Sequence, residues 1–126
     1  MGHLSANRMR MLTQIKALRH YHFLTSREDF ARVTRSPIRS TTKSLVGYLT
    51  KEPNLSSPKV GFVVSRAIGG SVIRHRVTRQ LRHASKSSLH ILPAQSMVVI
   101  RATKPEQNVH NEIPRLFTAL NEKAGR

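Results

Sequence analysis

The chain has 126 residues, of which 38% are hydrophobic, and its 22 Lys and Arg residues against 6 Asp and Glu residues give a formal net charge of +16. This length fits one compact domain, and the excess of positive charge predicts a polyanionic partner, first of all nucleic acid. The lack of cysteine excludes a disulfide framework and a thiolate metal site, and no apolar run approaches the ~20 residues of a membrane-spanning helix, so we expect a cytoplasmic protein that does not enter membranes.

The N-terminal region, residues 1–17, is basic and shows no clear hydrophobic periodicity. It also lacks the continuous apolar core and the cleavage site of a secretory signal. We therefore predict a flexible basic arm over residues 1–17, followed by a single domain over residues 18–126.

A short helix is predicted over residues 27–35. Two overlapping capping-box patterns precede it, one from Thr25 to Glu28 and one from Ser26 to Asp29, and the sequence does not decide between them. Pro37 ends the helix, because the residue before a proline is pushed out of the helical conformation.

Four segments have the composition of β-strands. Residues 45–51 and 59–65 are rich in β-branched and aromatic residues, and residues 40–43 form a weaker candidate. The turn-forming sequence EPNLSSP separates the first two, so we predict that these two strands pair with each other. The continuous apolar run at 97–103 predicts a buried strand.

Two further helices are predicted in the C-terminal half. Gly69 and Gly70 interrupt the chain before a long helix from Ser71 to about Leu89. The segment VHNEIPRLFTALNEKA predicts a final amphipathic helix, in which Pro114 is expected near the first turn, where its missing N–H is tolerated.

The long helix divides into an apolar and a basic face. Its apolar positions share one arc of the helical wheel, which we expect to pack on the sheet: Ile73, Val77, Leu81 and Ala84. The other arc is basic: Arg74, His75, Arg76, Arg79, Arg82 and Lys86. No acidic residue occurs between Glu52 and Glu106, and arginines three and four positions apart can grip phosphates bidentately. A face that is merely solvated remains the alternative.

The segment KVGFVVSRAIGGSVIRHRVTRQLR, residues 59–82, resembles the signature segment of the protein subunit of bacterial ribonuclease P. SREDFARV is similar to the first helix of that family, and the likeness runs from about Leu18 to Leu120. The resemblance implies an α+β sandwich of ribosomal-protein-like fold. A mixed four-stranded sheet would carry three helices and a left-handed βαβ crossover.

The resemblance also implies a function. Members of this family bind a catalytic RNA and help it to remove the 5′ leader from precursor tRNA, so the protein would be a non-catalytic subunit of an endoribonuclease, with no catalytic residue of its own. Magnesium would be bound by the RNA partner, and no protein partner is expected. RNA contacts are implied for Arg66, Arg74, Arg76, Arg79 and Arg82, and His75 between two of them can also donate and stack. Phe30 and Tyr48 are implied to bind the single-stranded leader.

The chain departs from the family pattern at Thr34, Ala67, Gly70, His75 and Thr78. Two other functions share its charge, namely a structural RNA-binding protein of ribosomal type and a DNA-binding regulator. A metal site is not expected, because the histidines show no ligand spacing: His20, His22, His83, His90 and His110.

Overall fold

A computed structural model describes residues 23–125 of the chain. The predicted flexible arm, residues 1–17, lies outside the described residues, as do Lys16, Arg19, His20 and His22. The elements follow one another as α2 (Arg27–Thr34), β1 (Ile38–Thr41), β2 (Leu45–Lys51), β3 (Lys59–Val63), α3 (Ser71–Ser88), the 3₁₀ helix η1 (Leu89–Ile91), β4 (Ser96–Ala102) and α4 (Val109–Ala124).

The four strands form one mixed sheet in the order β1-β2-β4-β3. β1, β2 and β4 are antiparallel neighbours, whereas β3 pairs with β4 in parallel. The prediction that residues 45–51 pair with residues 59–65 is therefore wrong, because β4 lies between them. β4 is apolar on both sides of the sheet, with Val98 and Val99 both fully buried on opposite faces, and a central position buries both sets of side chains.

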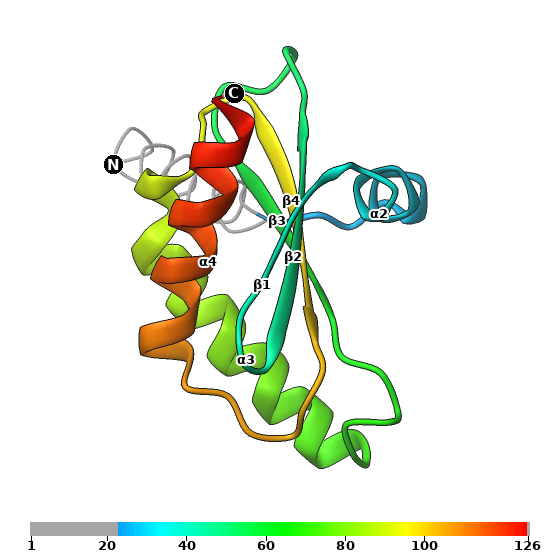
Figure 1. Ribbon diagram of the computed structural model, residues 1–126. Coiled ribbons are helices and arrows are strands. Elements are labelled where there is room, and N and C mark those ends of the chain that lie inside the picture. The colour runs from blue at the N-terminus through cyan, green and yellow to red at the C-terminus, as the bar shows by residue number, and fades with distance from the viewer. Residues whose placement is uncertain (1–22, 126) are drawn as a thin grey trace, which may run out of the picture.

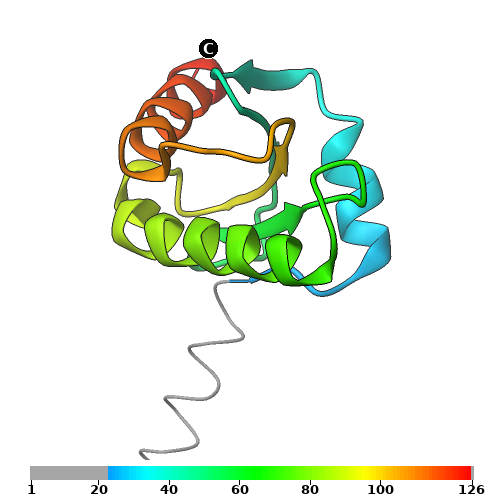
Figure 2. The same cartoon turned by 90° about the horizontal axis from the view of Figure 1, so that it is seen from below.

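The sheet separates two layers of helices. Figure 1 shows α3 and α4 on one face and α2 on the other. The larger core lies beneath α3 and α4 and contains Phe117, Leu81 and Leu49, and the smaller core lies beneath α2 and contains Val33, Val46 and Tyr48. The chain passes from β3 through α3 to the parallel strand β4, and the views along and across the strands show a left-handed crossover (Figures 1 and 2). Left-handed crossovers are rare, because about 98% of all connections between parallel strands of one sheet are right-handed.

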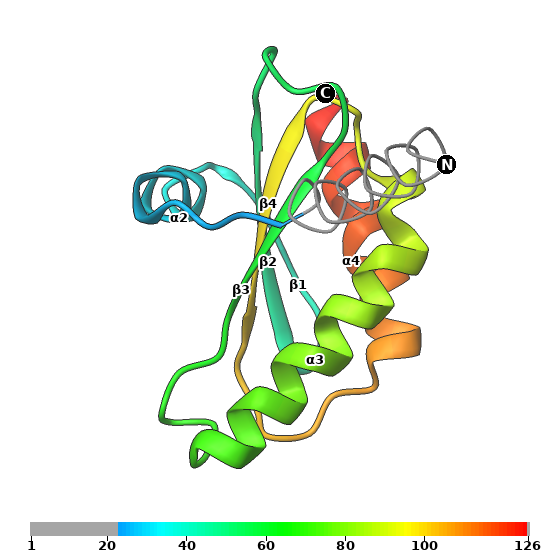
Figure 3. The same cartoon turned by 180° about the vertical axis from the view of Figure 1, so that it is seen from behind.

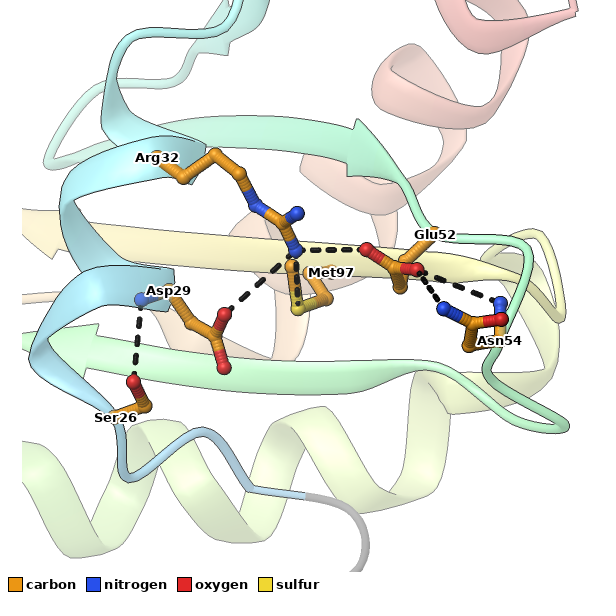
Figure 4. A network of polar contacts seen from close by, with 6 residues as sticks. All are labelled: Ser26, Asp29, Arg32, Glu52, Asn54 and Met97. Atoms are coloured by element: carbon orange, nitrogen blue, oxygen red, sulfur yellow. Dashed lines mark hydrogen bonds and ion pairs between the residues drawn. The ribbon is translucent and has the colours of Figure 1, made fainter.

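α2 is fixed at its start and along its side. The Asp29 N–H donates to Ser26 Oγ at 3.4 Å, so Ser26 is the N-cap and the alternative start at Thr25 is wrong. Arg32 donates to Glu52 Oε2 at 2.8 Å, contacts the Met97 sulfur at 3.7 Å and lies 3.6 Å from the Asp29 carboxylate (Figure 4). These contacts join α2 to the end of β2 and to the central strand.

α3 matches its predicted bounds, but its first turn is less buried than expected. Val77, Leu81 and Ala84 are buried, as predicted. Ile73 is 37% exposed, so its predicted packing on the sheet is wrong. The first turns of α3 extend past the ends of the strands, where there is no sheet to cover them (Figure 3).

α4 packs closely against the sheet. A Cβ at Gly47 of β2 would lie 2.9 Å from Leu120 Cδ1, so this glycine permits the close approach of the helix. Pro114 is the sixth residue of α4 and lies in its second turn, one turn later than expected. Its missing N–H leaves the His110 carbonyl without the usual helical donor.

Candidate RNA-binding surface

The outer face of α3 carries a row of basic side chains. Most of them are exposed: His75, Arg76, Arg79, Arg82, His83 and Lys86. Among residues 23–125, the ion pairs to Asp29 and Glu52 both use Arg32, and no carboxylate pairs with a basic side chain of α3. The 18-residue helix is about 27 Å long. It therefore presents uncompensated positive charge from the end of its first turn to its last turn, on the side facing away from the sheet.

Arg66 belongs to a tight turn just before α3. The Ile68 N–H donates to the Ser65 carbonyl at 3.0 Å, and the Gly69 N–H donates to the Arg66 carbonyl at 3.2 Å. Ile68 is buried and anchors the turn, and Gly69 adopts a φ of 157°, which favours glycine. The turn thus holds Arg66 exposed beside the start of the basic helix.

Arg74 differs from the other arginines of α3 because it is half-buried. Its Nε is buried and has no hydrogen-bond partner in the part of the chain that the structure describes. The hydroxyl of Thr78, one turn later, donates to the Arg74 carbonyl at 2.8 Å. Thr78, which departs from the family pattern, is therefore engaged with the helix backbone.

Phe23 completes this surface and was not identified from the sequence. It forms an isolated parallel bridge with Val60 at the edge of β3, which places its ring beside α3. The Arg82 guanidinium carbon lies 5.0 Å from the ring centroid, and Lys86 Nζ lies 5.8 Å from it. Stacking of this kind restricts a guanidinium while leaving its N–H edge free to donate. Only the long-range pairing with β3 brings Phe23 to the helix, and no local sequence pattern predicts that pairing.

The two predicted leader-binding residues lie on the opposite face of the sheet from α3, Phe30 on α2 itself and Tyr48 on β2 beneath it. Phe30 is half-buried and packs on Gly61, where an added Cβ would lie 2.4 Å from the ring. Tyr48 is only 8% exposed, and the Arg39 guanidinium lies 5.6 Å from its ring centroid. The structure thus brings Arg66 and the α3 residues together and separates Phe30 and Tyr48 from them. Leader binding by these two residues stays a prediction.

Glu112 is a buried carboxylate at the start of α4. It accepts hydrogen bonds from Thr42 Oγ1 at 2.8 Å, from the Ser44 N–H at 2.7 Å, from Ser44 Oγ at 2.6 Å and from the Asn108 N–H at 2.9 Å. Burial alone would raise the pKa of Glu112, but the hydrogen bonds from Ser44, Thr42 and Asn108 outweigh it and lower the pKa. The neighbouring half-open cavity of about 920 Å³ is lined by both lysines and glutamates, including Lys43, Lys104 and Glu106. We therefore assign Glu112 a structural role.

Within residues 23–125, no three histidine or acidic side chains lie close enough together to hold a metal ion. In the same range, no helix has the length and hydropathy needed to cross a membrane.

Comparison with known proteins identifies the family. The model of the ribonuclease P family matches residues 18–124. A ribonuclease P protein component from Nocardioides sp. is 40% identical over 89 residues, which covers 69% of this chain and 76% of that protein. The one from Mycolicibacterium gilvum is 36% identical over 107 residues, covering 76% and 86%. The structure of the Staphylococcus aureus ribonuclease P protein has the same fold, with a TM-score of 0.66, 16% identity, and coverage of 82% of this chain and 94% of that one. The resemblance inferred from the sequence is confirmed: the chain belongs to the family of ribonuclease P protein components.

Proposed function

We propose that this chain, as the protein subunit of the endoribonuclease ribonuclease P, binds the catalytic RNA through the outer face of α3 and the turn at Arg66. The observation that carries the proposal is the row of exposed basic side chains on α3, with which no carboxylate of residues 23–125 forms an ion pair. Family membership favours this function over a ribosomal protein or a DNA-binding regulator. We further propose that the protein works in the cytoplasm.

The chemistry of the surface suits phosphate binding. Arginine presents a planar fork of donors that matches two phosphate oxygens, and Arg76 and Arg79 are one turn apart on the same helix. Cations fixed on the protein neutralise RNA phosphates that would otherwise need magnesium. In this proposal magnesium is bound by RNA phosphates, and the protein lowers the magnesium concentration that the RNA needs in order to fold and cleave its substrate.

We propose precursor tRNA as the substrate, with its 5′ leader on the α2 face of the sheet. Phe30 is half-buried, so part of its ring is open to stack on an unpaired base. Tyr48 is nearly covered, so its contribution would need Arg39 to move off the ring. Phe30→Ala should weaken binding of precursor tRNA by about 1–3 kcal/mol and leave mature tRNA unaffected. Equal losses for both RNAs would assign Phe30 to core packing alone.

Reconstitution tests the main proposal. The protein is mixed with the ribonuclease P RNA of the same organism, and cleavage of precursor tRNA is measured as magnesium is reduced. We expect the protein to restore cleavage at magnesium concentrations where the RNA alone is inactive. No effect of the protein at any magnesium concentration would contradict the proposal. A dominant co-purifying ribosomal RNA would favour the ribosomal alternative instead.

A further inference from the structure

The basic helix begins with an exposed apolar tip, which we define as Val72 and Ile73. Val72 is 82% exposed and Ile73 is 37% exposed, and they are the exposed large hydrophobic residues among those the structure describes. Figure 3 shows why: α3 starts beyond the ends of the strands, so its first turn has no sheet beneath it. Burying such a residue would be favourable, and within residues 23–125 the fold leaves it open.

The Ile73 side chain of the tip packs against the turn that precedes α3. A Cβ on Gly69 would lie 3.1 Å from three atoms of the Ile73 side chain, so Ile73 packs closely against the turn. At Gly70 no atom of residues 23–125 lies within 4 Å of the corresponding position, so these residues leave the space beside the tip open. Val72 therefore projects outward from a fixed base.

The charges around the tip determine which partner fits it. Arg66, His75 and Arg76 are exposed on either side of it in the sequence, and no acidic residue occurs between Glu52 and Glu106. A second copy of a chain with a net charge of +16 would be repelled at this point. The surroundings favour a polyanion that also offers an apolar surface.

RNA offers such a surface where its bases are unpaired. In an A-form duplex the faces of the bases are stacked and closed, whereas bases in loops and bulges can be splayed out against side chains. We propose that Val72, backed by Ile73, packs on an unpaired nucleobase of the ribonuclease P RNA. The inference rests on the proposed function, because the arginines of α3 must hold that RNA in place.

Two substitutions at Val72 isolate the apolar contact. Val72→Thr keeps the size and the β-branch and replaces one methyl group with a hydroxyl, and Val72→Ile keeps the apolar character. Because Val72 is so exposed, both variants should unfold at the temperature of the unmodified protein. We expect Val72→Thr to bind the RNA about fourfold more weakly, the equivalent of one buried methylene, and Val72→Ile to bind at least as tightly as valine.

The salt dependence of binding separates this inference from the proposed function. Val72→Thr should lower the affinity equally at every salt concentration, because it removes no charge, whereas Arg76→Ala should flatten the slope of log affinity against log salt. If Val72→Thr binds normally while Arg76→Ala flattens the slope, the inference is overturned and the proposed function stands. If neither variant changes binding, both fail.

Chemical probing of the RNA bases identifies what the tip contacts. The unmodified protein should protect at least one unpaired base that becomes reactive again with Val72→Thr. Protection that is identical for both proteins would overturn the inference. Self-association of the free protein that Val72→Thr abolishes would also overturn it, because the tip would then be an interface between copies of the chain.

Discussion

Glu112 is a charged residue in a buried position, where its carboxylate accepts four hydrogen bonds. The donors come from the turn after β1 and from the start of α4, so this one side chain joins segments about seventy positions apart along the chain, from Thr42 to Glu112. Removing the negative charge would leave buried donors facing a poorer acceptor.

We expect Glu112→Gln to lower the free energy of unfolding by about 1–3 kcal/mol near neutral pH, because a buried donor left unsatisfied costs that much. The measurement is urea denaturation, and Glu122→Gln on the exposed side of α4 makes the same change of charge as a control. A loss of stability in the control equal to that of Glu112→Gln would contradict the structural role.

The same carboxylate gives a pH dependence whose sign follows from its lowered pKa. The pKa of Glu112 is lower in the folded protein than in the unfolded chain, where it is near 4.5, so the folded protein binds this proton less readily. Its contribution to stability is therefore complete above that value and is lost as the pH falls through the lower pKa of the folded state. The stability difference between the unmodified protein and Glu112→Gln should shrink over this acidic range. A difference that stays constant through it would contradict this assignment.

For single residues, sequence patterns predicted the roles that depend on neighbours close by in the sequence. The arginines of α3 could be found from spacing along one helix, and the same kind of pattern limited the cap of α2 to Thr25 or Ser26. Glu112 and Phe23 could not, because each acts through partners far away in the sequence, Ser44 and Val60 in these two cases. The burial of Tyr48 also depends on which face of the sheet α2 covers, which its own sequence does not state.

Among the elements, one contact of α2 with the sheet, that of the Phe30 ring with β3, depends on Gly61 having no side chain. A Cβ at Gly61 would lie 2.4 Å from Phe30 Cζ and 2.6 Å from Phe30 Cε1. We expect Gly61→Ala to destabilise the protein by about 1–3 kcal/mol through overpacking. In a Phe30→Leu background the cost should fall, because the smaller side chain leaves room for the methyl group.

The matched control for that experiment is Gly70→Ala, where an added Cβ meets nothing within 4 Å. Gly70 is the N-cap of α3, where alanine is less favourable than glycine, so the variant should lower the thermal midpoint by that small cost and by less than Gly61→Ala. An equal cost of Gly61→Ala in the presence and absence of Phe30 would show that the glycine is needed for its backbone and not for the contact with α2.

We expect the arginines of α3 to bind the RNA together. If Arg74, Arg76, Arg79 and Arg82 each neutralise a phosphate, log affinity for the RNA should fall with log salt by about 0.7–0.9 per contact. Replacing all four with alanine should therefore flatten the slope by about three units or more. A control set removes four exposed positive charges away from α3: Lys43, Lys51, Lys104 and Arg115. Equal slopes for the two quadruple variants would show that net charge matters and that the α3 face does not.

Local patterns also predicted most of the elements but not their arrangement. Hydrophobic periodicity and the flanking Gly and Pro residues defined β2 and α3 to within one or two residues. The strand order could not be read in this way, because β4 lies between β2 and β3 through contacts that are long-range in the sequence. The left-handed crossover came from the family resemblance, since the physical rule for such connections favours the other hand.

For the molecule as a whole, we expect that the purified chain alone does not cleave precursor tRNA. Hydrolysis of a phosphodiester by a protein usually requires metal ions clamped by carboxylates, or an acid and a base on either side of the phosphate. Asp29 and Glu52 are engaged with Arg32, and Glu112 is buried in its own hydrogen bonds. The other three carboxylates, Glu28, Glu106 and Glu122, lie on α2, in a loop and on α4, and within residues 23–125 none of them pairs with a basic side chain of α3.

The histidines of the basic helix do not supply the missing pair. His75 and His83 are eight positions apart on α3, and the helical rise between them is about 12 Å, too far to flank one phosphate. The concentrated positive charge of α3 should also repel a free magnesium ion, so we expect a metal to bind there only with RNA phosphates present. We therefore expect the RNA partner to perform the chemistry. The test is to incubate RNA-free protein with precursor tRNA and magnesium. Site-specific, metal-dependent cleavage that a point substitution in this chain abolishes would contradict this division of labour, whereas cleavage that appears only when the catalytic RNA is added is the result we expect.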